Sequence, residues 1–164
     1  MVWGGDRSAM DELARRWHPR LLRSARRMLG EDEPAHAVTQ ECWVAIIRGI
    51  HRLSNPERFA PWAFTILRRK CADAIRSQQA RRLHDGDGEH AEIADHGDPG
   101  GSVSILQAFA ALAPEQRLAA HLYFVEGLTL AEIADVQDIP TGTAKSRLFH
   151  ARRKLKVALS GEEK

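Results

Sequence analysis

The 164-residue sequence contains few cysteines, few aromatic residues and no long apolar run. Its two cysteines, Cys42 and Cys71, fall inside predicted helices and are too few for the disulfide framework of a small secreted domain, so we expect free thiols. The longest apolar runs, such as residues 42–47, span six residues. A membrane-spanning helix needs about 20 apolar residues, and the apolar core of a secretion signal needs about 7–15. We therefore expect a cytoplasmic protein with no membrane insertion.

The charges are nearly balanced overall, at net +2, but they are separated along the chain. Residues 1–80 have a net charge of +5, residues 81–101 of −4 and residues 102–164 of +1. The acidic segment is rich in Gly, Asp, His and Pro and has no apolar period, so it cannot bury enough surface to fold alone. This pattern predicts two small domains, residues 6–80 and 102–160, joined by a flexible acidic linker at residues 81–101.

Three histidines of the acidic segment, His84, His90 and His96, have acidic neighbours and could suggest a metal site. Their spacing matches no compact tetrahedral ligand set. The sequence therefore predicts neither a metal nor a cofactor.

Apolar residues in the N-terminal half recur at the helical period, and the alternation typical of strands is missing. We expect a first helix to stop at His18, because the residue before a proline disfavours helical backbone, and a second helix to run from Pro19 to Gly30. Two further helices are expected over residues 32–53 and 61–79. The fold class is therefore all-α.

The C-terminal half predicts a compact domain of four helices. Ser102 is expected to cap the first helix and Pro114 to open the second, in which Tyr123 lies in an apolar run and is expected to pack in the core. The side chains expected to point inward are Val103, Leu106, Phe109, Leu112, Leu118, Leu122 and Val125.

A short helix, a tight turn and a basic helix follow. Gly127 suits the position just past a helix end, and Thr129 with Glu132 has the spacing of a capping box. Asp138 stands in the turn, where a residue that tolerates left-handed backbone is needed, and Thr141 can cap the next helix. This order is the helix-turn-helix arrangement of DNA-binding proteins.

The basic helix, residues 141–156, has two different faces. Ala144, Leu148, Ala151 and Leu155 form an apolar stripe at the helical period, whereas the stretch carries six positive charges and no acid. Such a helix needs a core on one side and suits a polyanion on the other, which indicates DNA.

These motifs resemble region 4 of bacterial RNA polymerase sigma factors. The resemblance rests on APEQR (residues 113–117), GLTLAEIA (127–134) and GTAKSRLFHARRKL (142–155), in that order. It implies that the basic helix enters the major groove at the −35 promoter element. The candidate DNA-binding residues there are Thr141, Gly142, Thr143, Lys145, Ser146, Arg147, His150, Arg152 and Arg153.

The N-terminal half resembles sigma region 2 of the extracytoplasmic-function group, through residues 13–43 and FAPWAFTILRRKCADAIR (59–76). The resemblance implies that Gln40 and Glu41 bind the clamp of core RNA polymerase. The family often has an acidic pair just before this position, where this chain has His36 and Ala37, and often has Asn where this chain has Arg69. The candidates for binding the melted −10 strand are Asn55, Arg58, Arg68, Arg69, Lys70 and Arg76.

Taken together, the two resemblances imply an alternative sigma factor without enzymatic activity of its own. Its expected partners are core RNA polymerase, promoter DNA and an anti-sigma factor.

Three other classes share part of this pattern. A transcription regulator with an effector-binding or phosphoacceptor domain would have the helix-turn-helix, but the N-terminal half shows no strand alternation and no Gly-rich ligand loop. A recombinase would need a nucleophile, and the single tyrosine, Tyr123, lies at a predicted packing position. A helical interaction protein with no DNA role would not explain the six-charge helix.

Overall fold

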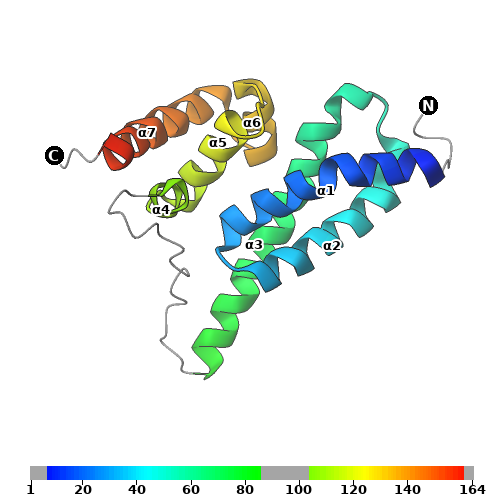
Figure 1. Ribbon diagram of the computed structural model, residues 1–164, viewed down its shortest axis with the longest axis horizontal. Coiled ribbons are helices and arrows are strands. Elements are labelled where there is room, and N and C mark those ends of the chain that lie inside the picture. Colours follow the sequence, from blue (N-terminus) through cyan, green and yellow to red (C-terminus); the bar gives the residue numbers. More distant parts are fainter. Residues whose placement is uncertain (1–6, 86–103, 161–164) are drawn as a thin grey trace. The chain divides into compact units, whose positions relative to one another are not determined.

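The computed structural model describes residues 7–85 and 104–160, and the chain divides into two compact units, Met1–Asp85 and Gly86–Lys164. Within those described residues every regular element is a helix, as the all-α prediction required (Figure 1). The first unit contains α1 (Arg7–Leu29), α2 (Asp32–Gly49), the short 3-10 helices η1 (Ile50–Arg52) and η2 (Pro56–Arg58), and α3 (Phe59–Asp85). The second contains α4 (Ile105–Ala110), α5 (Pro114–Phe124), α6 (Leu130–Gln137) and α7 (Thr141–Ser160).

Helices α1, α2 and α3 pack against one another in the first unit. Leu21, Ile46 and Phe64, one from each helix, are almost completely buried. The Trp17 ring meets Phe59 edge-on, with ring centroids 5.0 Å apart, and also contacts Phe64. Aromatic packing of this kind adds to the free energy gained from burial, and here it joins the middle of α1 to the start of α3.

The predicted interruption of the first helix at Pro19 is wrong, because α1 continues through it without a break. A proline inside a helix removes one backbone hydrogen bond. Pro19 lies on the exposed side of α1, so water can bind the carbonyl that loses its partner. On the opposite side Leu21 is buried and Trp17 packs on the core, and this packing outweighs the lost bond.

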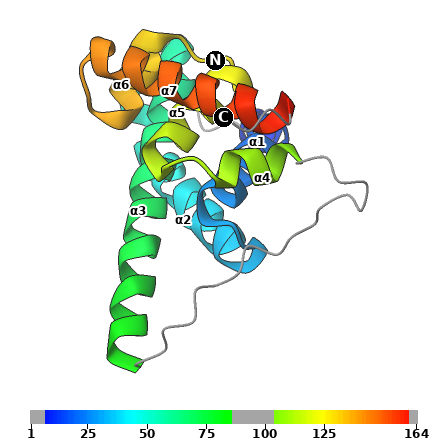
Figure 2. The ribbon, with the colours of Figure 1, turned by 90° about the vertical axis from the view of Figure 1, so that its left-hand side faces the viewer.

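The end of α3 was also predicted incorrectly. The helix extends past Gln79 to Asp85, into the first residues of the predicted linker, and its last turns project beyond α1 and α2 (Figure 2). Residues 77–85 lack glycine and proline and are rich in Gln, Ala and Arg, which favour helix, so an existing helix propagates without a core beneath it. Residues 86–103, which include most of the predicted linker as well as Ser102 and Val103, lie outside the described residues.

In the second unit, Ser104 caps α4 and forms a capping box with Gln107. The apolar core brings together Phe109, Leu112 and the α7 residue Leu155. Two inward predictions are wrong, because Leu106 is 53% exposed and Tyr123 is 43% exposed. Tyr123 occurs in an apolar run, residues 122–125, that is longer than one buried stripe can accommodate, so part of the run must face outward.

The helix-turn-helix has the predicted local chemistry. The Thr129 hydroxyl accepts from the Glu132 N–H at 3.1 Å, and the Glu132 carboxylate accepts from the Thr129 N–H at 2.9 Å. Gly127 and Asp138 have left-handed backbone, with φ of 72° and 54°. Thr141 is the first residue of α7 rather than its cap, because the preceding carbonyl, that of Pro140, accepts the first helical hydrogen bonds.

Arg117 joins α5 to the C-terminal end of α4. Two nitrogens of its guanidinium, Nε and Nη2, donate to three backbone carbonyls, those of Phe109, Ala110 and Leu112, at 3.0–3.1 Å. A cation at a helix C-terminus satisfies carbonyls that have no helical partner and interacts favourably with the helix dipole. Burial lowers the pKa of Arg117, whose three acceptors replace part of its hydration. The short helix α4 therefore depends on this side chain.

We predict that Arg117→Met lowers the free energy of unfolding of the second unit by about 2–3 kcal/mol, because charged hydrogen bonds to three carbonyls are lost. Far-UV circular dichroism under denaturant reports both units. All four tryptophans lie in the first unit, so tryptophan fluorescence reports that unit alone and should not change. Arg117→Lys keeps the charge and should recover part of the loss. An unchanged circular dichroism transition in Arg117→Met would contradict the role given to Arg117.

Candidate nucleic-acid and polymerase interfaces

One face of α7 is fixed by its burial. Ala144, Ala151 and Leu155 are buried against α4, α5 and α6, and Leu148 is half-buried, as the apolar stripe predicted. Side chains rotate by about 100° per helical residue, so Ser146, which is exposed, points away from this stripe. The opposite face of α7 is therefore available to a ligand.

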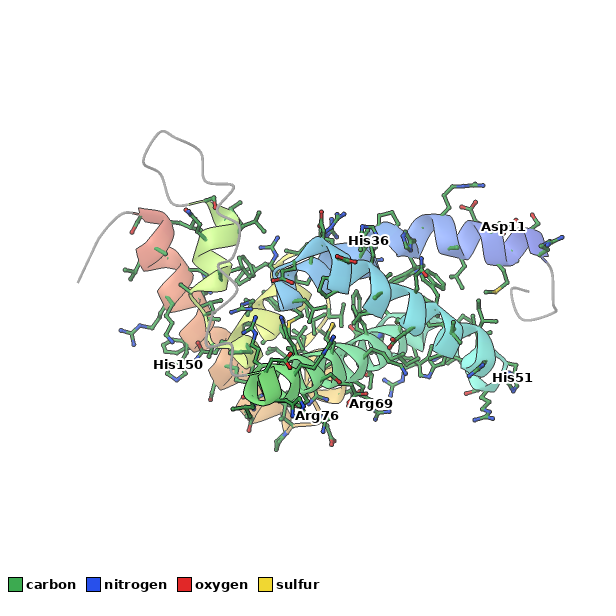
Figure 3. The ribbon with its side chains drawn as sticks, turned by 90° about the horizontal axis from the view of Figure 1, so that it is seen from below. Asp11, His36, His51, Arg69, Arg76 and His150 are labelled. Carbon is green, nitrogen blue, oxygen red and sulfur yellow. The ribbon has the colours of Figure 1, made fainter. Side chains whose placement is uncertain are left out.

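Eight of the nine predicted −35 residues are exposed, and Arg147 is the exception. Lys145 and Ser146 lie in the first two turns, while His150, labelled in Figure 3, lies near the middle of the helix. The helix α7 itself contains no acidic residue, and within residues 104–160 the acids nearest to it in sequence, Asp135 and Asp138, both lie before its first residue. The exposed members are Thr141, Gly142, Thr143, Lys145, Ser146, His150, Arg152 and Arg153.

Arg147 lies on a flank of α7 and has a partner. Its side chain is 23% exposed, and its guanidinium lies 3.1 Å from the Glu115 carboxylate of α5. Lys154, two turns further along the same flank, donates to the Gln116 side chain at 3.1 Å. The structure thus separates Arg147 from the other predicted residues.

Phe149 was not predicted as a site residue, although its ring is 56% exposed on the same side of α7 as Ser146 and Arg153. The Arg153 guanidinium lies 5.9 Å from the centre of the ring, within the range of a cation–π contact. The sequence carried a signal for this residue, since Phe149 is an apolar side chain that falls outside the predicted buried stripe.

The side of α7 that carries Phe149 also borders an open apolar groove of about 740 Å³. Phe124, Phe149 and Leu159 line it and are each at least half exposed. Cationic side chains, Arg152, Arg153 and Lys156, also line the groove. Exposed apolar surface with a polar border commonly marks a protein-binding site.

In α3 the predicted −10 residues do not share one face. Arg68, Arg69 and Lys70 are adjacent and point in directions about 100° apart, with only Arg69 fully exposed. Arg76 lies two turns after Arg69, so the two share one exposed side of α3, and both are labelled in Figure 3. The Arg76 guanidinium also contacts the Asp73 carboxylate one turn earlier.

The remaining predicted −10 residues, Asn55 and Arg58, are exposed in the segment before α3. The Asn55 side chain accepts from the Glu57 N–H at 3.0 Å and caps η2. Its carbonyl oxygen therefore has a structural role, and its amide NH₂ remains a donor.

Gln40 and Glu41 are exposed on α2, next to two apolar side chains that were not predicted as site residues. Val44 is 48% exposed and Ile47 is 58% exposed, and both lie on the side of the helix that carries Gln40. His36, one turn before Gln40 and labelled in Figure 3, lies with its Nε2 3.4 Å from the Arg26 guanidinium. This face of α2 combines polar groups with exposed aliphatic surface.

Other chemistry is limited in the described parts of the chain. Burial raises the pKa of the Cys42 and Cys71 thiols to about 12, so neither is a nucleophile at neutral pH. No group of His, Cys, Asp or Glu side chains in residues 7–85 and 104–160 is arranged to hold a metal ion. Among the helices of the described residues, none has the length and apolarity to cross a membrane.

Two known families match the two units. Residues 13–81 match Sigma-70 region 2, and residues 102–155 match Sigma-70, region 4. Together these matches cover most of the chain, and each contains the surfaces described above for its unit.

Similar proteins of known sequence and structure agree with this assignment. The chain is 30% identical to RNA polymerase sigma factor CarQ of Myxococcus xanthus, over 94% of this chain and 91% of that protein. It is 24% identical to the ECF RNA polymerase sigma factor SigW of Bacillus subtilis, over 94% and 91%. The fold is similar to that of the sigma factor RpoE from Bartonella quintana, solved with the anti-sigma factor NepR, at a TM-score of 0.79, 23% identity and coverage of 94% and 98%.

The family matches account for both halves of the molecule, including the acid-free basic helix and the exposed face of α2. The chain belongs to the sigma-70 family, and within it to the extracytoplasmic-function group of RNA polymerase sigma factors, which are non-enzymatic initiation factors that bind core polymerase and direct it to particular promoters.

Proposed function

We propose that α7 enters the major groove of the −35 element with its N-terminal half. The observation that carries this proposal is the exposed, acid-free basic face opposite the buried stripe of Ala144, Ala151 and Leu155. Recognition helices contact base edges mainly with their first turns. Lys145 and Ser146 are therefore the proposed base-edge contacts, and the exposed ring of Phe149 suits the methyl group of a thymine.

The phosphate contacts come from other parts of the same helix. The N–H groups of residues 141–143 stand at the positive end of the helix dipole, where a phosphate binds favourably. His150, Arg152 and Arg153 lie further along the exposed side and are proposed to approach the backbone of the duplex. Arg147, on the flank, is paired with Glu115 and is not among the proposed phosphate contacts of the wild-type chain.

We predict that Lys145→Ala weakens binding to a −35 duplex by about 1–3 kcal/mol, and weakens binding to a duplex of scrambled sequence much less, because Lys145 is a proposed base-edge contact. The matched control is Lys156→Ala, which removes the same charge from nearly the same side of α7 about 16 Å further along the helix. Fluorescence anisotropy measures both, and equal losses for the two variants would refute the assignment.

We also propose that α3 and the segment before it hold the melted −10 strand. Arg69 and Arg76 share one exposed side of α3, and the half-buried ring of Trp62 lies on that side two turns before Arg69. Cations that pair with phosphates and aromatic rings that stack on bases are the usual means of binding single strands. Asn55, Arg58, Arg68 and Lys70 lie on the borders of this surface and are proposed as additional contacts.

We predict that Arg69→Ala combined with Arg76→Ala reduces promoter opening by core polymerase, measured by permanganate reactivity of unpaired thymines. Binding to a template that is already unpaired at −10 should also weaken, because the two arginines are proposed to contact the single strand itself. The control is Arg15→Ala combined with Arg16→Ala on α1. These arginines are also exposed, and Arg15 has an ion pair to Glu12 one turn away, like that of Arg76. Equal defects in both double variants would indicate an effect of net charge alone.

Core polymerase is proposed to bind the exposed side of α2. Gln40 and Glu41 supply polar contacts, and Val44 and Ile47 supply the apolar area that a protein interface needs at its centre. His36 and Ala37, which replace two carboxylates common at this position in the family, make this side less acidic.

We predict that Ile47→Asp reduces binding to core polymerase at least tenfold in the absence of DNA, because a carboxylate would be buried at the interface. Leu83→Asp is the control, because it makes the same kind of chemical change within the same unit. The Leu83 side chain is 86% exposed at the far end of α3. Surface plasmon resonance on immobilised core polymerase measures the difference. Equal binding by the two variants would place the polymerase contact elsewhere.

An anti-sigma factor is a further proposed partner. Among proteins of similar fold, the sigma factor RpoE was solved in complex with the anti-sigma factor NepR, and CnrH was solved in complex with the cytosolic domain of CnrY. The exposed apolar groove along α7 and the exposed side of α2 are surfaces that such a partner could cover. We further propose that the protein works in the cytoplasm. Transcription by core polymerase on a genomic fragment library, with mapping of start sites, tests the function as a whole.

A further inference from the structure

The N-terminal turn of α5 contacts both helices of the helix-turn-helix. The backbone carbonyl of Glu115 accepts from the Gln137 side chain of α6 at 2.9 Å. The carboxylate of the same residue holds the Arg147 guanidinium of α7 at 3.1 Å, and the next residue, Gln116, accepts from Lys154. Glu115 therefore lies where α5, α6 and α7 meet, and its side chain is directed to the recognition helix.

The Glu115–Arg147 pair lies at the border of the DNA-binding face. Arg147 is 23% exposed, whereas the Glu115 side chain is 71% exposed. On α7, Arg147 is about 60° from the centre of the buried stripe and far from the side that carries Ser146. From this position its guanidinium cannot meet base edges, but it can exchange Glu115 for a phosphate of the duplex backbone.

The two possible partners of Arg147 compete. An ion pair this exposed contributes little to the free energy of folding, so exchanging the carboxylate for a phosphate costs little free energy by itself. A phosphate at the same place would, however, lie beside the negative charge of Glu115, and that repulsion favours the existing pair. The Glu115 carboxylate thus neutralises one cation of α7, a helix that contains no acidic residue of its own.

We propose that Glu115 sets the general DNA affinity of the recognition helix, because it withholds Arg147 from a phosphate contact. This inference rests on the proposed function of α7 as the −35 reader. Binding to arbitrary DNA depends almost entirely on the number of phosphates that are neutralised. Binding to the promoter depends also on base contacts from the opposite side of α7, which Arg147 does not make. One phosphate contact fewer therefore lowers the affinity for both kinds of duplex by a similar factor and limits how much of the protein is held on DNA outside promoters.

The test compares the full chain and its Glu115→Gln variant on two fluorescent duplexes, one with the −35 sequence found by start-site mapping and one of scrambled sequence. Affinities are measured between about 50 and 200 mM salt, where phosphate contacts dominate the salt dependence. In the variant, log affinity for the scrambled duplex should fall more steeply with log salt by about 0.9, as for one additional phosphate contact. The affinity for the promoter duplex should rise by a similar factor, because a phosphate contact carries no sequence information.

Two further variants complete the experiment. Arg147→Gln alone should leave unchanged the slope of log affinity against log salt for the scrambled duplex. In the Glu115→Gln background, Arg147→Gln should remove the increase in slope, a result that a purely structural role of Glu115 would not produce. Asp138→Asn removes the same charge at the turn before α7, where asparagine also tolerates the left-handed backbone. The inference would be overturned if Asp138→Asn steepened the salt dependence as much as Glu115→Gln does. It would also be overturned if the Glu115→Gln slope equalled that of the wild-type chain. Far-UV circular dichroism verifies that each variant is folded.

The outcome also separates this inference from the function on which it rests. If the wild-type chain prefers the promoter duplex and Lys145→Ala weakens binding, but Glu115→Gln changes nothing, only the role of Glu115 is refuted. If the wild-type chain shows no preference, or Lys145→Ala has no effect, the proposed −35 contact is itself refuted.

Discussion

The burial of one narrow stripe of α7 is the constraint on which the DNA-binding unit depends. Ala144, Ala151 and Leu155 are buried, the last two in a core shared with α4 and α5, and small alanines allow the helices to approach closely. Because a helix has a fixed angular period, the same contacts that hold α7 in place also determine which side chains face outward. Stability and recognition in this unit are therefore two consequences of one packing arrangement.

The other unit uses a helix in a different way. The first half of α3 is a core element, with Phe64, Leu67 and Cys71 buried against α1 and α2. Its second half has no core beneath it, and the helix continues only because its residues favour that conformation. The charged side of α3 thus begins over a packed base and extends beyond it.

Electrostatic balance in the recognition unit comes from neighbouring helices. The basic helix contains no acid, yet its flank is paired with α5 through Glu115 and Gln116, while the opposite side retains its charge. Pairing on a flank moderates the affinity for any polyanion without reducing the charge available for a specific site. The apolar groove beside this surface adds a place for a protein partner within reach of the same cations.

The sequence by itself determined the helical class, the capping box at Thr129, the left-handed turn at Asp138 and the buried stripe of α7, because each of these depends on local spacing and local backbone chemistry. It also determined the family, through motifs in a fixed order. Only the tertiary structure decided that α1 passes through Pro19, that Tyr123 is exposed and that Arg147 is paired with Glu115. These outcomes depend on what packs against each residue from elsewhere in the chain, and a one-dimensional pattern does not contain that information.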